Sequence, residues 1–61
     1  MMEVTRISKD RYKITCCSYV FLVYKPDYGQ YWHVSNDQMH IHRSCDDLAE
    51  VFDYLDFMFG A

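Results

Sequence analysis

The sequence predicts an α+β fold: an antiparallel sheet of four to five short strands, followed by one C-terminal amphipathic helix packed on one face. Residues 44–59 are the only stretch with a clear helical period. The segments before them alternate apolar and polar residues, and turn-forming residues separate these segments. Strands followed by a terminal helix are typical of an α+β domain.

The length of 61 residues predicts one domain, spanning residues 1–61. A chain this short buries only about 60% of the surface of its extended form, so it needs a rich core. Hydrophobic residues make up 51% of this sequence, which meets that need. Two Gly and one Pro argue against a disordered or linker-like chain.

The first half of the chain predicts three strands. Residues 3–7 are rich in β-branched side chains, and residues 8–11 form a turn signal. The alternation from Tyr12 onward runs past residue 16 without Gly or Pro, and that is long against a typical strand of about 5–6 residues. We therefore predict a reversal at Cys17-Ser18, followed by a central strand, residues 19–24, that is apolar on both faces.

The second half predicts a hairpin and a final strand. In residues 26–29, Pro presets the backbone for a turn and Gly ends it. Residues 30–34 would form the return strand of the hairpin. A second turn at residues 35–37 would lead into a last strand at residues 38–43.

The helix has start and stop signals. Ser44 is the predicted N-cap, Asp47 its partner three residues on, and Gly60 the left-handed residue after the helix. The predicted buried stripe comprises Leu48, Val51, Phe52, Leu55, Met58 and Phe59. The opposite side carries the acidic residues Asp46, Glu50 and Asp53.

Phe57 does not fit the buried stripe and falls on the acidic side of the helix. In one interpretation it belongs to a frayed last turn that folds back onto the sheet. In the other it faces a partner, since exposed aromatic residues are favoured anchors at interfaces.

The net charge is −3, with nine acids against six bases, and most acids come late in the chain. A nucleic-acid binder of this size is normally basic, so nucleic acid is an unlikely partner. The acidic helix could face the basic surface of a protein or of a protein–nucleic-acid complex. Alternatively, its charges only keep a surface helix solvated.

One helix covers one face of the sheet, so the other face stays open. Depending on register, it would carry several of Tyr12, Tyr19, Phe21, Val23, Tyr31 and His33. Such a patch usually marks a contact site, so a homodimer or a protein partner is expected. Alternatively, tyrosine hydroxyls and lysine stems keep this face soluble on its own.

The cysteines and apolar runs indicate a cytoplasmic protein without a membrane partner. Cys16 and Cys17 are adjacent in a strand, so they should point to opposite sides and pair poorly. The first residues resemble no secretory leader, and the longest apolar run, residues 19–24, is too short to span a bilayer.

Two constellations could carry chemistry, and both signals are weak. His40 and His42 would share a strand face with His33 and Cys45 nearby, but a zinc site needs four converging ligands at spacings this chain lacks. At the first turn of the helix, Cys45 would have its thiol pKa lowered by the helix dipole, while the adjacent acids oppose that effect. We predict no metal, no cofactor and no enzymatic activity.

The sequence thus favours a small protein-interaction module, most simply an inhibitor that occupies a basic surface of a larger macromolecule. Phage and mobile-element proteins directed against host defence, such as anti-CRISPR or anti-restriction factors, often have this size and charge. The predicted contact residues are Asp46, Glu50, Asp53, Phe57, Tyr28, Tyr31 and Trp32.

Two alternatives remain open. One is a single-stranded nucleic-acid binder that uses sheet aromatics beside a few cations. Its residues would be Tyr19, Phe21, Tyr31 and Trp32 with Arg11, Lys13 and Lys25. The other is a homodimeric accessory subunit that pairs through the open sheet face.

Overall fold

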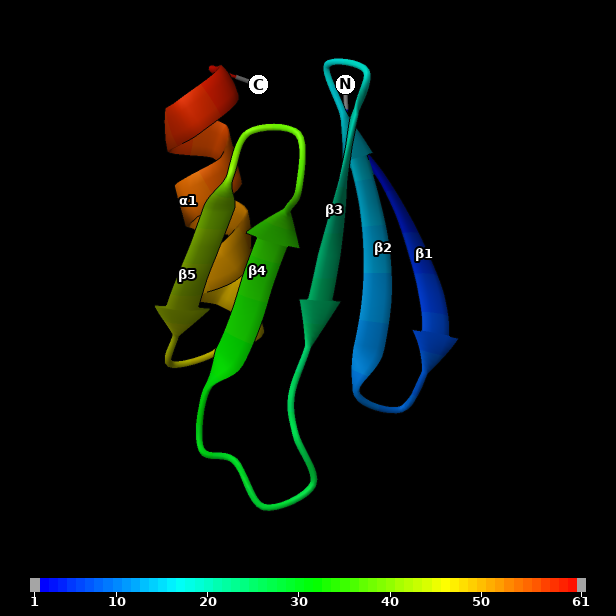
Figure 1. Cartoon of the computed structure of the whole chain (residues 1–61), viewed down its shortest axis with the longest axis vertical. Coiled ribbons are helices and arrows are strands. Elements are labelled where there is room, and N and C mark those ends of the chain that lie inside the picture. Colours follow the sequence, from blue (N-terminus) through cyan, green and yellow to red (C-terminus); the bar gives the residue numbers. More distant parts are fainter. Residues whose placement is uncertain (1, 61) are drawn as a thin grey trace.

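The computed structural model describes residues 2–60, which form a five-stranded antiparallel sheet with one helix on one face (Figure 1). The predicted fold class is confirmed; residues 1 and 61 of the predicted domain lie outside the described part. The strands follow one another in sequence order across the sheet. Their bounds are β1 Met2–Ser8, β2 Arg11–Cys16, β3 Tyr19–Tyr24, β4 Trp32–Asn36 and β5 Ile41–Cys45, and the helix is α1 Leu48–Phe59.

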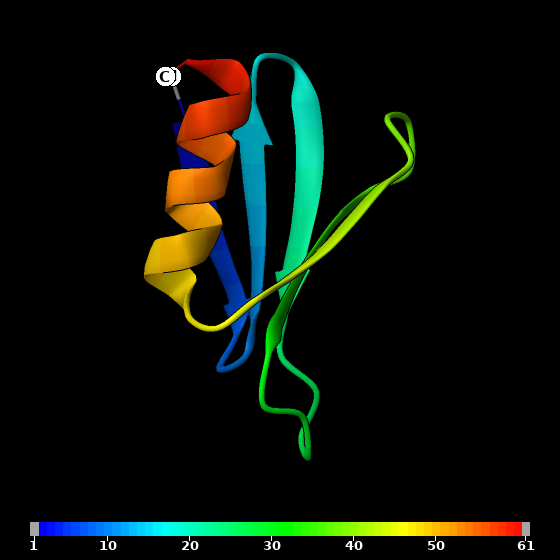
Figure 2. The same cartoon turned by 90° about the vertical axis from the view of Figure 1, so that its left-hand side faces the viewer.

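The sheet is strongly twisted, and its β4–β5 hairpin leans away from β3 on the side opposite the helix (Figure 2). The ladder between β3 and β4 has three registered pairs, the last of which is Leu22 with Ser35. Beyond it, the side-chain amide of Asn36 donates a 2.9 Å hydrogen bond to the Val20 carbonyl. This side chain therefore connects the two halves of the sheet where the backbone ladder has ended.

The core lies between the helix and the inner face of the sheet. Val51 and Leu55 are fully buried, and Leu48, Phe52 and Phe59 pack against the same core. The sheet contributes Ile14, Cys16, Phe21, Val23, Val34 and Cys45. Of the predicted helix stripe, only Met58 is exposed, at 41%.

The helix begins at Leu48, so the prediction that Ser44 caps it is wrong. Ser44 lies in β5 and pairs with His33, because the β4–β5 ladder continues to Cys45. Asp47 is the N-cap, and its Oδ1 accepts a 2.8 Å hydrogen bond from the Glu50 amide. The prediction that Gly60 is the left-handed residue after the helix is confirmed.

Both ends of α1 satisfy backbone groups that the helix leaves unpaired. Glu50 Oε2 accepts a 2.8 Å hydrogen bond from the Asp46 amide, which completes a reciprocal cap displaced by three residues from the predicted one. At the C-terminus, Gly60 has a φ of 61° and its amide donates to the Asp56 carbonyl at 2.8 Å.

The predicted return strand at 30–34 and final strand at 38–43 are each displaced toward the C-terminus, to 32–36 and 41–45. The reason lies in Asn36, which does not open the turn but ends β4 inside the core. Its Oδ1 accepts a 2.7 Å hydrogen bond from the Met39 amide, and this contact shapes the turn. The turn therefore occupies residues 37–40 rather than 35–37.

The predicted composition of the open face is largely wrong. Phe21 and Val23 are buried under the helix, at 0% and 1% exposure, whereas Val20 and Leu22 are about half exposed. The strand is apolar on both sides, so its sequence does not distinguish the two registers, and a shift of one residue exchanges the faces. Of the predicted open-face residues, Tyr12 and Tyr19 also pack against the core, while His33 lies on the open face, paired with Tyr24.

The predicted reversal at Cys17-Ser18 is confirmed. Cys16 pairs with Tyr19, so Cys17 and Ser18 form a two-residue turn with φ values of 54° and 70°. Cys17 therefore leaves the strand, and its Sγ lies 3.9 Å from that of Cys16. The expectation that these two thiols point to opposite sides is wrong.

Candidate interaction surfaces

The acidic helix surface comprises Asp46, Glu50, Asp53 and Phe57. Phe57 is 85% exposed, so the interpretation in which it folds back onto the sheet is wrong. Its ring borders a shallow hollow of about 280 Å³ that is also lined by Glu50 and Asp53, with Arg43 and Tyr54 completing the wall. An aromatic side chain thus stands in water beside two carboxylates.

The side chains around the hollow differ in how they are held. The Arg43 guanidinium carbon lies 4.6 Å from the centre of the Tyr54 ring, a cation–π arrangement that orders both side chains. Glu50 is held by the helix cap, because its carboxylate accepts from the Asp46 amide. Asp53 is exposed, so its carboxylate is available to an incoming cation.

The other predicted contact residues lie in the β3–β4 loop and at the start of β4. Tyr28 is fully exposed in the β3–β4 loop, and Tyr31, just before β4, is 49% exposed. Trp32 is half-buried, with its ring centre 6.0 Å from that of Tyr12. The β3–β4 loop and the last turn of α1 lie at opposite ends of the molecule (Figure 1). Phe57, in that last turn, is therefore far from Tyr28. Trp32 pairs with Cys45, so Tyr31 and Trp32 lie near Asp46 at the start of the helix.

The open sheet face carries an aromatic row formed by Tyr24, His33 and His42. The Tyr24 and His33 ring centres are 5.3 Å apart and nearly stacked, and the His33 and His42 centres are also 5.3 Å apart. Ser44 Oγ lies 3.3 Å from His33 Nδ1 and helps to fix that ring. Sequence reasoning missed this row, although Tyr24 ends the central strand and the two histidines lie on neighbouring predicted strands.

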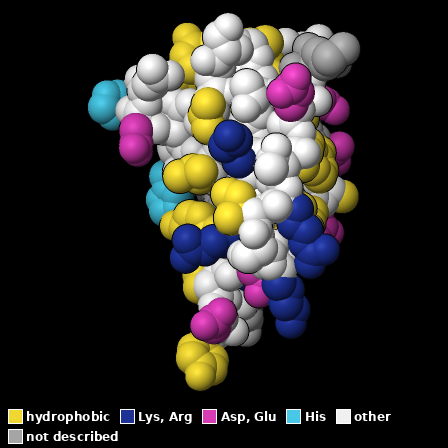
Figure 3. Space-filling view, turned by 90° about the vertical axis from the view of Figure 1, so that its right-hand side faces the viewer, with side chains coloured by type: hydrophobic (Ala, Val, Ile, Leu, Met, Phe, Trp, Pro, Cys, Tyr) yellow, Lys and Arg dark blue, Asp and Glu magenta, His cyan; other side chains and the backbone are white. Residues whose placement is uncertain are grey.

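Cations flank the aromatic row on the same face. Arg11 pairs with Tyr24, and Lys13 pairs with Leu22, so both side chains point to the open side. Figure 3 looks onto the β1 edge: Lys and Arg side chains lie across its middle and lower part, with apolar side chains between them. Arg11 and Lys13 are therefore on the side of the sheet opposite the helix.

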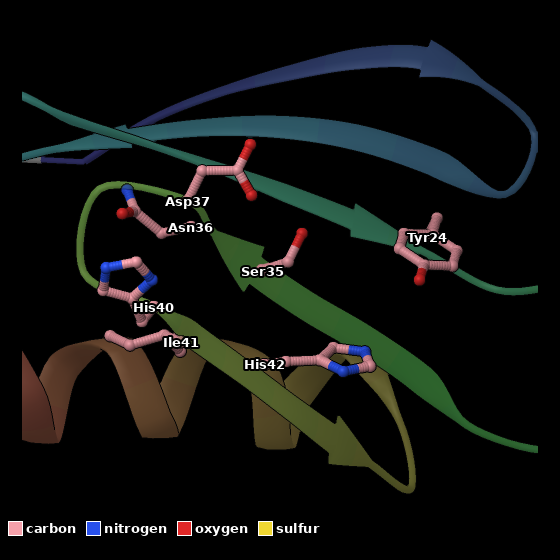
Figure 4. Close-up of a pocket in the computed structure, with 7 residues that line it drawn as sticks. All are labelled: Tyr24, Ser35, Asn36, Asp37, His40, Ile41 and His42. Carbon is pink, nitrogen blue, oxygen red and sulfur yellow. The ribbon is translucent and has the colours of Figure 1, made fainter.

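The β4–β5 hairpin and β3 border an open hollow of about 640 Å³. Figure 4 shows the His40 and His42 rings, the Ser35 hydroxyl and the Asp37 carboxylate around it, with Tyr24 at one end. Rings, a hydroxyl and a carboxylate can hold a planar polar group by stacking and hydrogen bonding. The hollow is shallow, which favours a surface contact over an enclosed small-molecule site.

The histidine and cysteine side chains do not converge. His33 and His42 are neighbours on the open face, His40 lies in the 37–40 turn, and Cys45 is buried on the helix side. Within residues 2–60, no group of three or more His, Cys, Asp or Glu is arranged to hold a metal ion.

The environment of Cys45 does not lower the pKa of its thiol. It is the last residue of β5 rather than part of the first helical turn, so the expected dipole effect is misplaced. Burial raises the pKa of its thiol, and the Glu50 carboxylate adds to this effect. The neutral thiol behaves as a small apolar side chain in the core.

Comparisons of the chain with protein-family models, with curated proteins and with solved structures find no match. Within the described part of the chain, no helix is both long and apolar enough to cross a membrane.

Proposed function

We propose that the protein is a small interaction module that uses the acidic helix surface to occupy a basic surface of a larger macromolecule. The observation that carries this proposal is the 85% exposure of Phe57 beside Glu50 and Asp53. Leaving an aromatic ring in water forgoes about 1.5–3 kcal/mol of burial energy, which a partner recovers by covering it. Carboxylates around the ring favour a partner rich in Lys and Arg.

The partner is a protein or a protein–nucleic-acid complex with a basic surface. The 61-residue chain inhibits this partner by binding to it, without catalysis. More specifically, we propose that the protein is an anti-defence factor of a phage or mobile element, such as an anti-CRISPR or anti-restriction factor. A cytoplasmic location is supported by three cysteines without a disulfide.

The test is affinity capture from cells of the source organism, followed by mass spectrometry and direct binding of the purified partner. Phe57→Ala and Asp53→Lys should each lower affinity at least tenfold, since both change exposed side chains of the acidic helix surface. Ile7→Ala and Glu3→Lys are matched controls, because these residues are exposed on β1. A partner that binds Phe57→Ala as tightly as the wild type would refute the proposal.

A second candidate function is single-stranded nucleic-acid binding by the open face. The observation that favours it is the aromatic row beside Arg11 and Lys13. Bases stack on aromatic rings while phosphates contact cations, so binding should weaken with salt. Fluorescence anisotropy with a labelled single-stranded oligonucleotide should show binding that Lys13→Glu and His42→Ala reduce, and Asp53→Lys should not reduce it. Undetectable binding at low salt would exclude this function.

The third candidate is a homodimer through the same face, favoured by the half-exposed Val20 and Leu22. Sedimentation equilibrium should then give twice the chain mass, and Leu22→Glu should return the monomer. A chain that stays monomeric at all concentrations would exclude the homodimer.

A further inference from the structure

The two thiols at the β2–β3 turn form a pair that differs in exposure. Cys16 is fully buried in the core, Cys17 is exposed in the turn, and their Sγ atoms are 3.9 Å apart. An oxidant in solution therefore reaches one sulfur first, with the second sulfur already beside it. Cys45 is also buried, but it lies at the end of β5.

The backbone of this turn is unusual for its residues. Two-residue turns with positive φ at both positions favour Asn and Gly, because other side chains are strained there. This turn holds Cys17 and Ser18, with φ values of 54° and 70°. Strain retained at a position that brings two reactive groups together is a reason to look for a function of that position.

We propose that Cys16 and Cys17 form a reversible modification site, which a low-molecular-weight disulfide oxidises to a disulfide between the two adjacent residues. The proposal is independent of the acidic helix surface and of the open face. The two thiols would react in this way whichever macromolecule the protein binds.

The chemistry proceeds in two exchanges. The Cys17 thiolate attacks one sulfur of the small disulfide, forms a mixed disulfide and releases a small thiolate, which takes up the proton that Cys17 lost. The Cys16 thiolate then attacks Cys17 Sγ, closes the protein disulfide and releases the second small thiolate, which takes up the Cys16 proton. Two protein thiols are oxidised and one small disulfide is reduced to two thiols.

The second exchange depends on deprotonation of the buried Cys16 thiol. Burial raises the pKa of the Cys16 thiol, and the neighbouring Cys17 adds to this effect. Since only the thiolate attacks, closure should accelerate as the pH rises.

The closed bond should be easy to reduce. Adjacent Cα atoms are about 3.8 Å apart, which is shorter than the spacing of about 4.4–6.8 Å found across ordinary disulfides. A strained disulfide has a high reduction potential, so a modest excess of small thiol should reopen it. The site therefore responds reversibly to the thiol–disulfide balance.

The test treats the purified protein with oxidised glutathione and follows the intact mass. The wild type should lose two hydrogen atoms, and a small thiol should restore the original mass. Cys16→Ser should stop at a stable mixed disulfide on Cys17, and Cys17→Ser should stay unmodified. Cys45→Ser is the matched control and should behave as the wild type. Tryptic cleavage at Arg43 separates Cys45 from the pair, so the position of the bond is read directly.

A second measurement tests whether the two thiols are neighbours without requiring the disulfide to form. Phenylarsine oxide bridges two neighbouring thiols, and it should bind the wild type and Cys45→Ser at least tenfold more tightly than Cys17→Ser, in which only an exposed residue has changed. Equal binding of phenylarsine oxide to Cys17→Ser would overturn the proposal. So would a wild type that accumulates only the mixed disulfide, links to a second chain or forms a bond to Cys45.

Discussion

The side chain of Asn36 replaces the backbone ladder between β3 and β4 by donating a 2.9 Å hydrogen bond to the carbonyl of Val20. The same side chain accepts from the Met39 amide at 2.7 Å, and Asn36 is itself only 4% exposed. One buried amide thus fixes both the lean of the hairpin and the shape of its turn.

Asn36→Ala should therefore lower the free energy of unfolding by about 1–3 kcal/mol, because it removes two hydrogen bonds made by a buried side chain to the Val20 carbonyl and the Met39 amide. Urea denaturation measures the change. Ser35→Ala, one residue earlier and on the open face, should change it by less than about 0.5 kcal/mol. Equal losses for the two variants would show that the amide is not holding the hairpin.

The cap of α1 gives a second prediction. Asp47→Ala should cost about 0.5–2 kcal/mol, because the Glu50 amide loses its acceptor. Ser44→Ala should cost less, since Ser44 lies in β5 and not at the helix start. Thermal unfolding followed by circular dichroism compares the two variants, and a larger loss for Ser44→Ala would restore the cap predicted from sequence.

Helix packing gives a third prediction. Leu55→Ala should cost about 2–5 kcal/mol, because Leu55 is fully buried and its loss leaves a cavity. Met58→Ala, one turn on and 41% exposed, should cost much less. Urea denaturation of both variants checks the difference, and similar losses would mean that the helix is rotated on the sheet.

Backbone strain in the β2–β3 turn gives a fourth prediction. Ser18→Gly should stabilise the protein by about 1 kcal/mol, since Gly adopts the φ of 70° without the penalty of a side chain. Ser35→Gly is the matched control and should destabilise, because Ser35 is in strand β4. Guanidinium denaturation of the reduced proteins measures both, and a destabilised Ser18→Gly would contradict the strain.

The pH dependence of stability follows from Cys45. Burial raises the pKa of this thiol in the folded state, so the folded chain holds the proton more tightly than the unfolded chain does. The resulting stability is present below the unfolded thiol pKa of about 8.5 and is lost as the pH rises through the folded value. Between pH 8 and 10, the free energy of unfolding should fall less steeply for Cys45→Ala than for the wild type. Val34→Ala, a buried change without a titrating group, should keep the wild-type slope.

Local sequence patterns predicted where the strands, turns and helix lie better than they predicted which side of the sheet each side chain faces. The reversal at Cys17-Ser18, the terminal helix and Gly60 follow from run length, periodicity and backbone preference, which act over a few residues. The face of β3 does not, because Val20 and Leu22 are as apolar as Phe21 and Val23. Only pairing with neighbouring strands decides which set the helix covers, and that is a tertiary effect.

Of the candidate sites, the one on the helix was predictable from local spacing, and the one on the sheet was not. The exposed position of Phe57 follows from helical spacing, since 100° per residue places it among Glu50 and Asp53. The aromatic row depends on cross-strand register, so sequence spacing alone does not bring Tyr24 beside His33. The net charge of −3 also hides the placement of Arg11 and Lys13 on the face opposite the acidic helix.

The order β1-β2-β3-β4-β5 has a kinetic consequence. Each strand pairs only with its neighbours along the chain, so each hairpin closes over a short loop and loses little chain entropy. Folding should be rapid for a β-rich protein, with hairpins forming first and the helix docking last to complete the core. A chain of this design needs no distant segment to be synthesised before its sheet begins to assemble.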